Sequence, residues 1–302
     1  MVATRSIPAA LALFALCAPD AALAEEPVPE IYTPTSAWAI DYAEDSCALR
    51  RAFASGEKKL ELELRQFEPE GALAILVSGP EMNLLTQQAS IRLGPDVDYI
   101  PKPNAFRVKL SNDWVGITFR DELVPYADVP MVEERRNDYS PYDYWDEHDF
   151  QARFRKINNL SIKGALETPI SLELGSMLAP KVALDACLSE LITRWGIDAE
   201  AHQTLSREVK ILNLKKLTYA FSRNYPREMI IAEQSGIVQY RLMVDERGKP
   251  SACHLQLASN HREFEKVSCK LLMNVARFDP ALDKDGKPIA SYWINAIIFR
   301  IG

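Results

Sequence analysis

Two cysteines and two histidines lie close together near the end of the sequence, in a combination that could hold a metal ion. The stretch CHLQLASNHREFEKVSC begins at Cys253, ends at Cys269, and contains His254 and His261. Thiolates and imidazoles are common ligands of Zn²⁺, which needs all of them within about 2.3 Å of the ion. The same two cysteines could instead form a disulfide bond. The choice between the two depends on the elements that position these residues.

The stretch is predicted to begin in a strand and to end in a helix. Residues 251–257 alternate as a strand, and an apolar stripe at helical spacing follows: Phe264, Val267, Leu271 and Val275. Successive residues of a strand point to opposite faces, so Cys253 and His254 diverge. In the helix, His261 and Cys269 are eight residues apart, about 12 Å along the axis. These side chains cannot converge on one ion, and the sequence therefore argues against zinc here.

Other candidate chemistry is sparse. The segment DYSPYDYWDEHDF, residues 138–150, carries the possible metal ligands Asp143, Asp146, Glu147, His148 and Asp149. No second cluster completes such a site, so an acidic loop or helix start is expected instead. The chain contains no G-x-S-x-G, H-E-x-x-H, C-x-x-C or glycine-rich phosphate loop. We predict no catalytic residues, no bound metal and no cofactor; a dispersed catalytic triad in a hydrolase stays an alternative.

The N-terminus predicts export. Arg5 precedes an apolar run over residues 7–18, and Ala-Leu-Ala ends at Ala24, a pattern typical of a cleaved signal peptide. The run is shorter than the roughly 20 residues that span a bilayer. We expect cleavage after Ala24 and a periplasmic protein. Four cysteines then remain, and an even number in an exported chain favours disulfides, with three pairings open.

Composition excludes some functions and suggests two units. The chain is 47% hydrophobic and 25% charged, as in ordinary globular proteins, and its net charge of −7 argues against nucleic acid as a partner. Residues 224–302 carry 11 Lys and Arg against 9 Asp and Glu, so the acidity lies before them. We predict an α+β protein: a β-rich domain over residues 25–200, a connector over 201–223, and a C-terminal domain over 224–302.

The predicted N-terminal domain is a series of strands with one long helix. Five strands, expected at residues 58–67, 72–77, 89–93, 106–110 and 114–119, resemble an antiparallel meander. Two further strands are expected at residues 159–163 and 169–174. The helix covers residues 180–195 and places Cys187 on its core-facing stripe. The polar connector is expected to hold one strand at residues 209–214.

The C-terminal pattern predicts helix, strand, strand, helix, strand, which gives a three-stranded antiparallel sheet with helices on one side. The strands are 236–244, 251–257 and 290–301. The motifs YP at Tyr225, VDxxG ending at Gly248, RFxPA from Arg277, and GxP from Gly286 follow in order. Together they resemble the C-terminal domain of the TonB family. Family members carry a membrane anchor and a Pro-rich linker, and we expect this chain to have a cleavable signal peptide in place of the anchor and no long Pro-rich linker.

The resemblance implies a disulfide and a mode of binding. Family members with paired cysteines in the second strand and the next helix match Cys253 and Cys269, which leaves Cys47 for Cys187. Members bind a segment of an outer-membrane transporter by adding it as a strand beside their last one. The implied binding residues are Tyr225, Pro226, Tyr292, Trp293, Asn295 and Ile297.

We therefore expect a non-enzymatic periplasmic adaptor whose partner is an envelope protein or peptide segment, such as an outer-membrane transporter. No membrane span is expected after signal cleavage. The first alternative is a membrane-retained energy transducer of the TonB type, in which the N-terminal segment stays uncleaved. The second is a periplasmic hydrolase or metal-binding enzyme.

Overall fold

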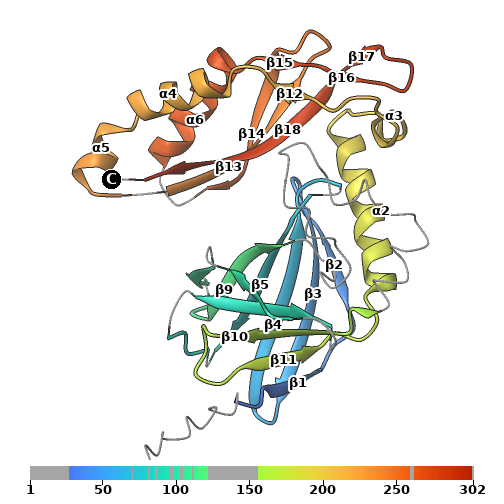
Figure 1. Ribbon diagram of the computed structural model, residues 1–302, viewed down its shortest axis with the longest axis vertical. Coiled ribbons are helices and arrows are strands. Elements are labelled where there is room, and N and C mark those ends of the chain that lie inside the picture. The colour runs from blue at the N-terminus through green and yellow to red at the C-terminus, as the bar shows by residue number, and fades with distance from the viewer. Residues whose placement is uncertain are drawn as a thin grey trace, which may run out of the picture.

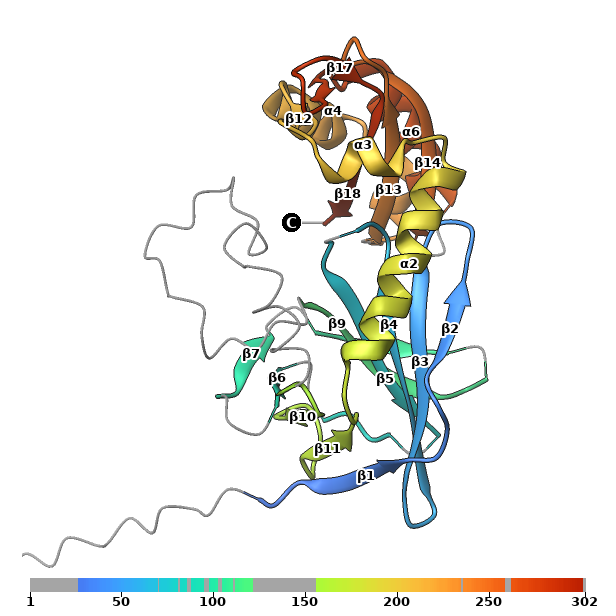
Figure 2. The same ribbon diagram turned by 90° about the vertical axis from the view of Figure 1, so that its right-hand side faces the viewer.

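The computed structural model shows a large curled sheet, one long helix and a smaller sheet (Figures 1 and 2). It describes residues 27–69, 71–80, 82–85, 88–94, 98–102, 105–110, 112–121, 156–234, 236–258 and 262–300. The predicted signal peptide at 1–24 and the acidic segment at 138–150 lie outside these ranges. The protein is of the mixed α+β class and rich in strands, as its sequence predicted. None of the described helices is both long enough and apolar enough to cross a membrane.

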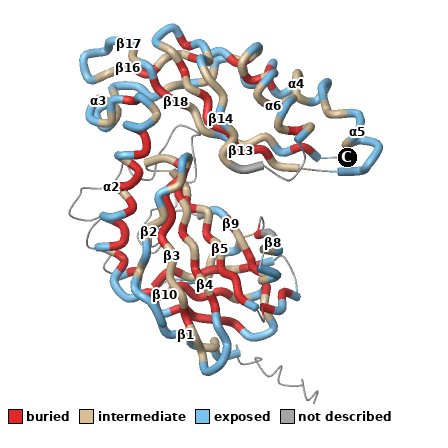
Figure 3. The backbone as a smooth tube through the Cα atoms, turned by 180° about the vertical axis from the view of Figure 1, so that it is seen from behind, coloured by how far each residue is buried: buried red, intermediate tan, exposed pale blue. Residues whose placement is uncertain are grey.

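The described part of the large sheet has 11 strands in the order β7-β6-β10-β11-β1-β3-β4-β5-β9-β8, with β2 paired to β3. Their bounds are β1 Glu30–Pro34, β2 Ala39–Tyr42, β3 Cys47–Ser55, β4 Lys58–Gln66, β5 Leu73–Gly79, β6 Ala89–Leu93, β7 Ile100–Lys102, β8 Phe106–Lys109, β9 Val115–Asp121, β10 Asn159–Lys163 and β11 Ile170–Glu173. The alternation in β4 is as predicted: Leu60, Leu62 and Leu64 are buried and the residues between them are not. Figure 3 shows the buried positions recurring along the neighbouring strands.

The expected simple meander is wrong in its connections. Strands β3, β4 and β5 do form consecutive antiparallel pairs. However, β6 pairs with β10 rather than with β5, and β1 lies between β3 and β11, parallel to β11. Alternation of apolar residues tells which face of a strand is buried but not which strand lies beside it. The first three strands were also missed, because β1 (EIYTP) buries only Tyr32.

Helix α2 (Leu178–Arg194) covers β3 and continues toward the small sheet (Figure 1). Its buried stripe includes Leu184, Cys187 and Leu188, so Cys187 faces inward as predicted. There it forms a disulfide with Cys47, with the two Cα atoms 6.2 Å apart. Gly196 follows the helix with φ +83°, a conformation that glycine adopts without strain. The long helix is thereby covalently attached to the start of β3.

The small sheet has the predicted three antiparallel strands in the order β14-β13-β18. Its elements are α4 Leu214–Arg223, α5 Arg227–Ile231, β13 Gly236–Val244, β14 Pro250–Ala258, α6 Arg262–Val275 and β18 Ser291–Phe299. The same domain has two separate two-stranded sheets: β12 Lys210–Ile211 with β15 Phe278–Asp279, and β16 Ala281–Leu282 with β17 Pro288–Ile289. The predicted turn between β13 and β14 needs glycine, because a Cβ at Gly248 would lie 1.9 Å from the carbonyl oxygen of Phe278.

The stretch predicted as a connector, residues 201–223, holds more structure than expected. Besides α3 (Ala199–Gln203) it contains α4, which packs on α6 through the buried Leu217 and half-buried Phe221. Leu214, Leu217 and Phe221 recur at helical spacing within LKKLTYAFSR, a helical signal that the prediction of a connector passed over. Helix α4 is therefore a packed part of the C-terminal domain rather than a linker.

Helix α6 is rotated slightly from its predicted orientation. Its core-facing positions are Phe264, Ser268 and Leu272, continued by Ala276, rather than the line through Leu271 and Val275. Ser268 is accommodated in the core because its hydroxyl donates to the carbonyl of Phe264 at 2.7 Å. The rotation brings Cys269 toward β14, where it forms the predicted disulfide with Cys253.

Candidate functional site

Strand β18 lies at an edge of the small sheet. It pairs with β13 over nine residues, and within the described ranges no strand lies on its other side. The backbone N–H of Ala296 donates to the side-chain Oδ1 of Asn295 at 2.7 Å, so this N–H points away from β13. Since backbone groups alternate along a strand, the N–H groups of Ile294 and Ile298 face the same open edge. The edge therefore offers hydrogen-bonding groups to another strand.

The side chains of β18 alternate between two packed faces, as predicted. Trp293 packs toward the helices, with its ring 5.1 Å from Phe278 and 5.8 Å from Tyr240. Tyr292 faces the other way, is 7% exposed, and makes an edge-to-face contact with Trp195 at 5.3 Å. The two faces thus have different partners: the helices of the small sheet on one side and α2 on the other.

A groove of about 370 Å³ runs between the open edge of β18 and α4. Its lining comprises Leu214, Leu217, Thr218, Phe221, Ser222, Tyr225, Tyr240, Trp293, Asn295, Ala296, Ile297, Ile298, Phe299 and Arg300. Four of the predicted binding residues, Tyr225, Trp293, Asn295 and Ile297, meet here. Tyr292 does not, because it faces α2, and Pro226 is instead the N-cap of α5. The contribution of α4 was missed, since that segment was predicted to be a connector.

Tyr225 is held firmly at one end of the groove. Its hydroxyl donates to the carbonyl of Gln234 at 2.5 Å. Its ring stands edge-on to Phe264 and Phe299, with centroids 5.6 and 5.5 Å away. Aromatic rings packed in this geometry gain stability beyond the area they bury. Tyr225 is therefore fixed in position at this end of the groove.

The face of the small sheet opposite the helices contacts the N-terminal unit. Arg241 of β13 is 3% exposed, and its Nη1 lies 2.5 Å from Oδ1 of Asp45. Its guanidinium stacks on Trp195, 3.7 Å from the ring centroid. Burial lowers the pKa of Arg241, and the carboxylate of Asp45 opposes that shift. This ion pair joins residues 196 positions apart. In the sequence, the one feature that pointed to this ion pair was a single arginine, Arg241, in the otherwise apolar second half of β13.

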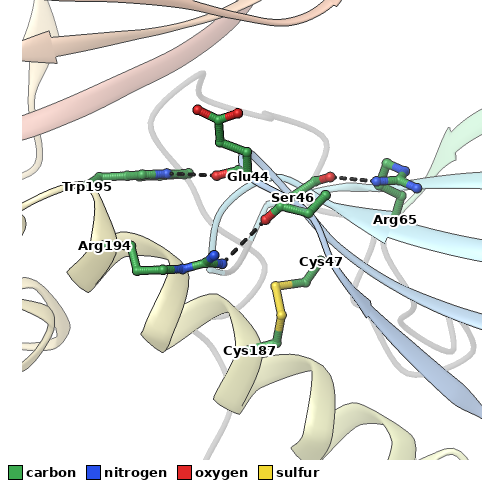
Figure 4. Close-up of a disulfide and its surroundings, with 8 residues drawn as sticks. Glu44, Ser46, Cys47, Arg65, Cys187, Arg194 and Trp195 are labelled. Atoms are coloured by element: carbon green, nitrogen blue, oxygen red, sulfur yellow. Dashed lines mark hydrogen bonds between the residues drawn. A yellow bond between two sulfur atoms is a disulfide. The ribbon is translucent and has the colours of Figure 1, made fainter.

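The loop that carries Asp45 is itself anchored to α2 (Figure 4). The indole Nε1 of Trp195 donates to the carbonyl of Glu44 at 3.5 Å. Two residues after Asp45, Cys47 forms its disulfide with Cys187. Asp45 is therefore presented to the small sheet by a short segment with little freedom, and the two sheets are held in a defined orientation.

Besides Arg241, His202 and Glu68 have pKa values shifted by burial. His202 of α3 lies 2.7 Å from the Ser291 hydroxyl through Nε2, stacks on Tyr292, and has a pKa lowered by burial. Glu68, just after β4, has its pKa raised to about 7, chiefly by burial; Arg120 opposes the shift and Glu208 adds to it. Their effects on stability therefore have opposite dependence on pH.

The described residues contain no group of three or more His, Cys, Asp or Glu side chains that could hold a metal ion. Cys253 and Cys269 are joined to each other, and His254 is exposed on β14. His148 and His261 lie outside the described residues. The stretch from Cys253 to Cys269, with its two cysteines and two histidines, thus contains a structural disulfide.

Comparison with known protein families bears on the small sheet. No curated protein matches the chain. Residues 222–301 match the model of one protein family, described as the Gram-negative bacterial TonB protein C-terminal. The matched segment begins at the end of α4 and includes α5, α6 and all three strands of the small sheet. The C-terminal unit of this chain is therefore a TonB-like C-terminal domain.

Proposed function

We propose that this protein is a non-enzymatic adaptor of the periplasm that binds an extended peptide segment of an envelope protein. The segment adds to β18 as a fourth strand. An outer-membrane transporter is the expected partner, because the C-terminal domain is TonB-like. The N-terminal unit holds the binding domain in a fixed orientation through α2 and the Asp45 loop.

The observation that carries this proposal is the open edge of β18 beside a groove. Backbone groups at the edge supply affinity for any extended chain, and the groove receives alternate side chains, which supplies selectivity. The groove is lined largely by apolar and aromatic side chains, and its described lining has one charged residue, Arg300. It therefore favours a segment with apolar residues at every second position.

Replacing Ile298 by proline tests the strand-addition mode. Ile298→Pro removes an N–H that faces the open edge and leaves the donors to β13 in place, a change that edge strands tolerate. Ile298→Val keeps the N–H and serves as the matched control. Binding is measured by fluorescence anisotropy with labelled synthetic peptides from the periplasmic N-terminal segments of outer-membrane transporters. We expect Ile298→Pro to weaken binding at least tenfold and Ile298→Val to change it less than threefold; equal effects would refute strand addition.

Replacing Asn295 tests the same mode of binding through a change that should raise, rather than lower, the affinity for the peptide. Its side chain occupies the outward N–H of Ala296, so an incoming strand must displace it. Asn295→Ala frees this donor, and affinity should rise by up to about tenfold, the value of one hydrogen bond. Asn274→Ala, on the exposed side of α6, is the control. Weaker binding by Asn295→Ala would show instead that the amide itself contacts the peptide.

A further inference from the structure

A continuous basic segment lies on the outer side of the C-terminal domain. Residues 209–227 (VKILNLKKLTYAFSRNYPR) contain five lysines and arginines and no Asp or Glu, although the whole chain has a net charge of −7. The five cations are Lys210, Lys215, Lys216, Arg223 and Arg227, and we call them the basic face. All five are exposed. In the described part of the chain, none forms an ion pair with a carboxylate.

The structure explains why these cations point outward. Helix α4 turns Leu217 and Phe221 toward α6. Lys215, Tyr219 and Arg223 follow at spacings of four residues and therefore lie together on another side. Arg223 stacks on Tyr219 with 5.5 Å from its guanidinium carbon to the ring centroid, and donates to the phenol at 2.8 Å. Three cations of the basic face, Lys215, Lys216 and Arg223, thus lie on one ordered helix, and Lys210 of β12 and Arg227 of α5 flank it in sequence.

Exposed apolar side chains surround the basic face. Leu212, which precedes α4, and Tyr219, on α4, are each 60% exposed. Ile230 and Ile231 of α5 are 51% and 73% exposed. Side chains of this size, interspersed with cations and exposed to water, are typical of helices that lie on membranes. Figures 1 and 2 show α4 on the side of the small sheet that faces away from the N-terminal sheet, and Figure 1 shows α5 at one end of the small sheet.

We propose that the basic face binds the surface of an anionic phospholipid bilayer. The lysines and arginines would contact the headgroups, and the neighbouring leucine, tyrosine and isoleucine side chains would enter the interfacial layer. Each cation contributes about a fivefold gain in partitioning to an anionic surface. The apolar side chains are separated by cations and are not gathered in one hollow, which suits a fluid surface better than an acidic protein of fixed shape. The groove beside β18 uses a different side of α4 and stays free for a peptide.

Vesicle co-sedimentation tests this proposal. The chain from Glu25 onward is used, so that the apolar run at residues 7–18 does not itself insert. Vesicles contain phosphatidylcholine alone or phosphatidylcholine with phosphatidylglycerol at 3:1. We expect binding only to the anionic vesicles, and release of the protein when sodium chloride is raised from 50 to 500 mM.

The variant Lys215→Gln/Lys216→Gln/Arg223→Gln should lower partitioning to anionic vesicles by about 100-fold. The matched control is Lys249→Gln/Lys270→Gln/Lys284→Gln, which removes three exposed cations elsewhere in the same domain and should lower it less than threefold. Equal losses in both variants, equal binding to both vesicle types, or no binding at 50 mM salt would each overturn the proposal. Binding to poly-glutamate without binding to vesicles would also overturn it, in favour of an acidic protein.

Discussion

Asp45→Ala should weaken the contact between the two sheets more than Arg241→Met does. The side chain of Arg241 is 4% exposed and that of Asp45 is 22% exposed. Removing Asp45 leaves a buried guanidinium without its carboxylate, a change that costs about 3–5 kcal/mol at fully buried sites. Asp45 lies at the rim of the interface, so we expect about 3 kcal/mol. Arg241→Met keeps most of the packing on Trp195 and leaves a carboxylate that water can reach, so we expect about 1 kcal/mol.

Urea unfolding followed by circular dichroism measures these free energies, and tryptophan emission reports the surroundings of Trp195. Asp41→Ala is a matched control, because Asp41 pairs with Arg50 at an exposed site and should contribute less than about 1 kcal/mol. The double variant Asp45→Ala/Arg241→Met should be about as stable as Arg241→Met alone, since no unpaired buried charge is left. The reasoning is refuted if Arg241→Met costs as much as Asp45→Ala, or if the two losses add.

Three further outcomes are expected. Removing the second disulfide by Cys253→Ala/Cys269→Ala should cost roughly 3 kcal/mol in the chain-entropy account, and a loss below about 1 kcal/mol in urea unfolding would contradict it. The pKa of His202 is lowered from its ordinary 6.5, so the unfolded chain takes up a proton first and stability falls as the pH drops below about 6.5. The thermal midpoint of His202→Gln should fall less over this range than that of the parent; equal slopes would exclude His202 as the cause. The pKa of Glu68 is raised from 4.5 to about 7, so its contribution is fully present below pH 4.5 and is lost as the pH rises through 7. Glu68→Gln should remove this loss between pH 4 and 8, and a slope that Glu68→Gln leaves unchanged would refute it.

The elements whose evidence is local were predictable from the sequence. Period-two alternation predicted β4 and β13, and the glycine after Val-Asp predicted the hairpin turn that follows β13. The two disulfides followed from an even cysteine count together with the family resemblance. In each case a short stretch of residues carries the whole signal.

The features that were missed depend on partners distant in sequence. Strand β1 is placed by β11, about 140 residues later, and its own sequence has little alternation. Helix α4 is stabilised by packing on α6 and not by a long apolar stripe of its own. Strand β18 was predictable as a strand, but the groove beside its open edge was not, because α4 forms the opposite side of that groove. Contacts between residues distant in sequence determine whether such elements form and where they lie, and a single sequence does not show these contacts.

The order of the cysteines along the chain simplifies oxidation. After the predicted signal peptide they occur as Cys47, Cys187, Cys253 and Cys269, and the structure joins the first to the second and the third to the fourth. An oxidising enzyme that acts on a chain emerging N-terminus first, and links each new thiol to the preceding free one, produces both native bonds directly. A chain oxidised in this order during export should therefore need an oxidant but no disulfide isomerase, because consecutive pairing leaves no bond to rearrange.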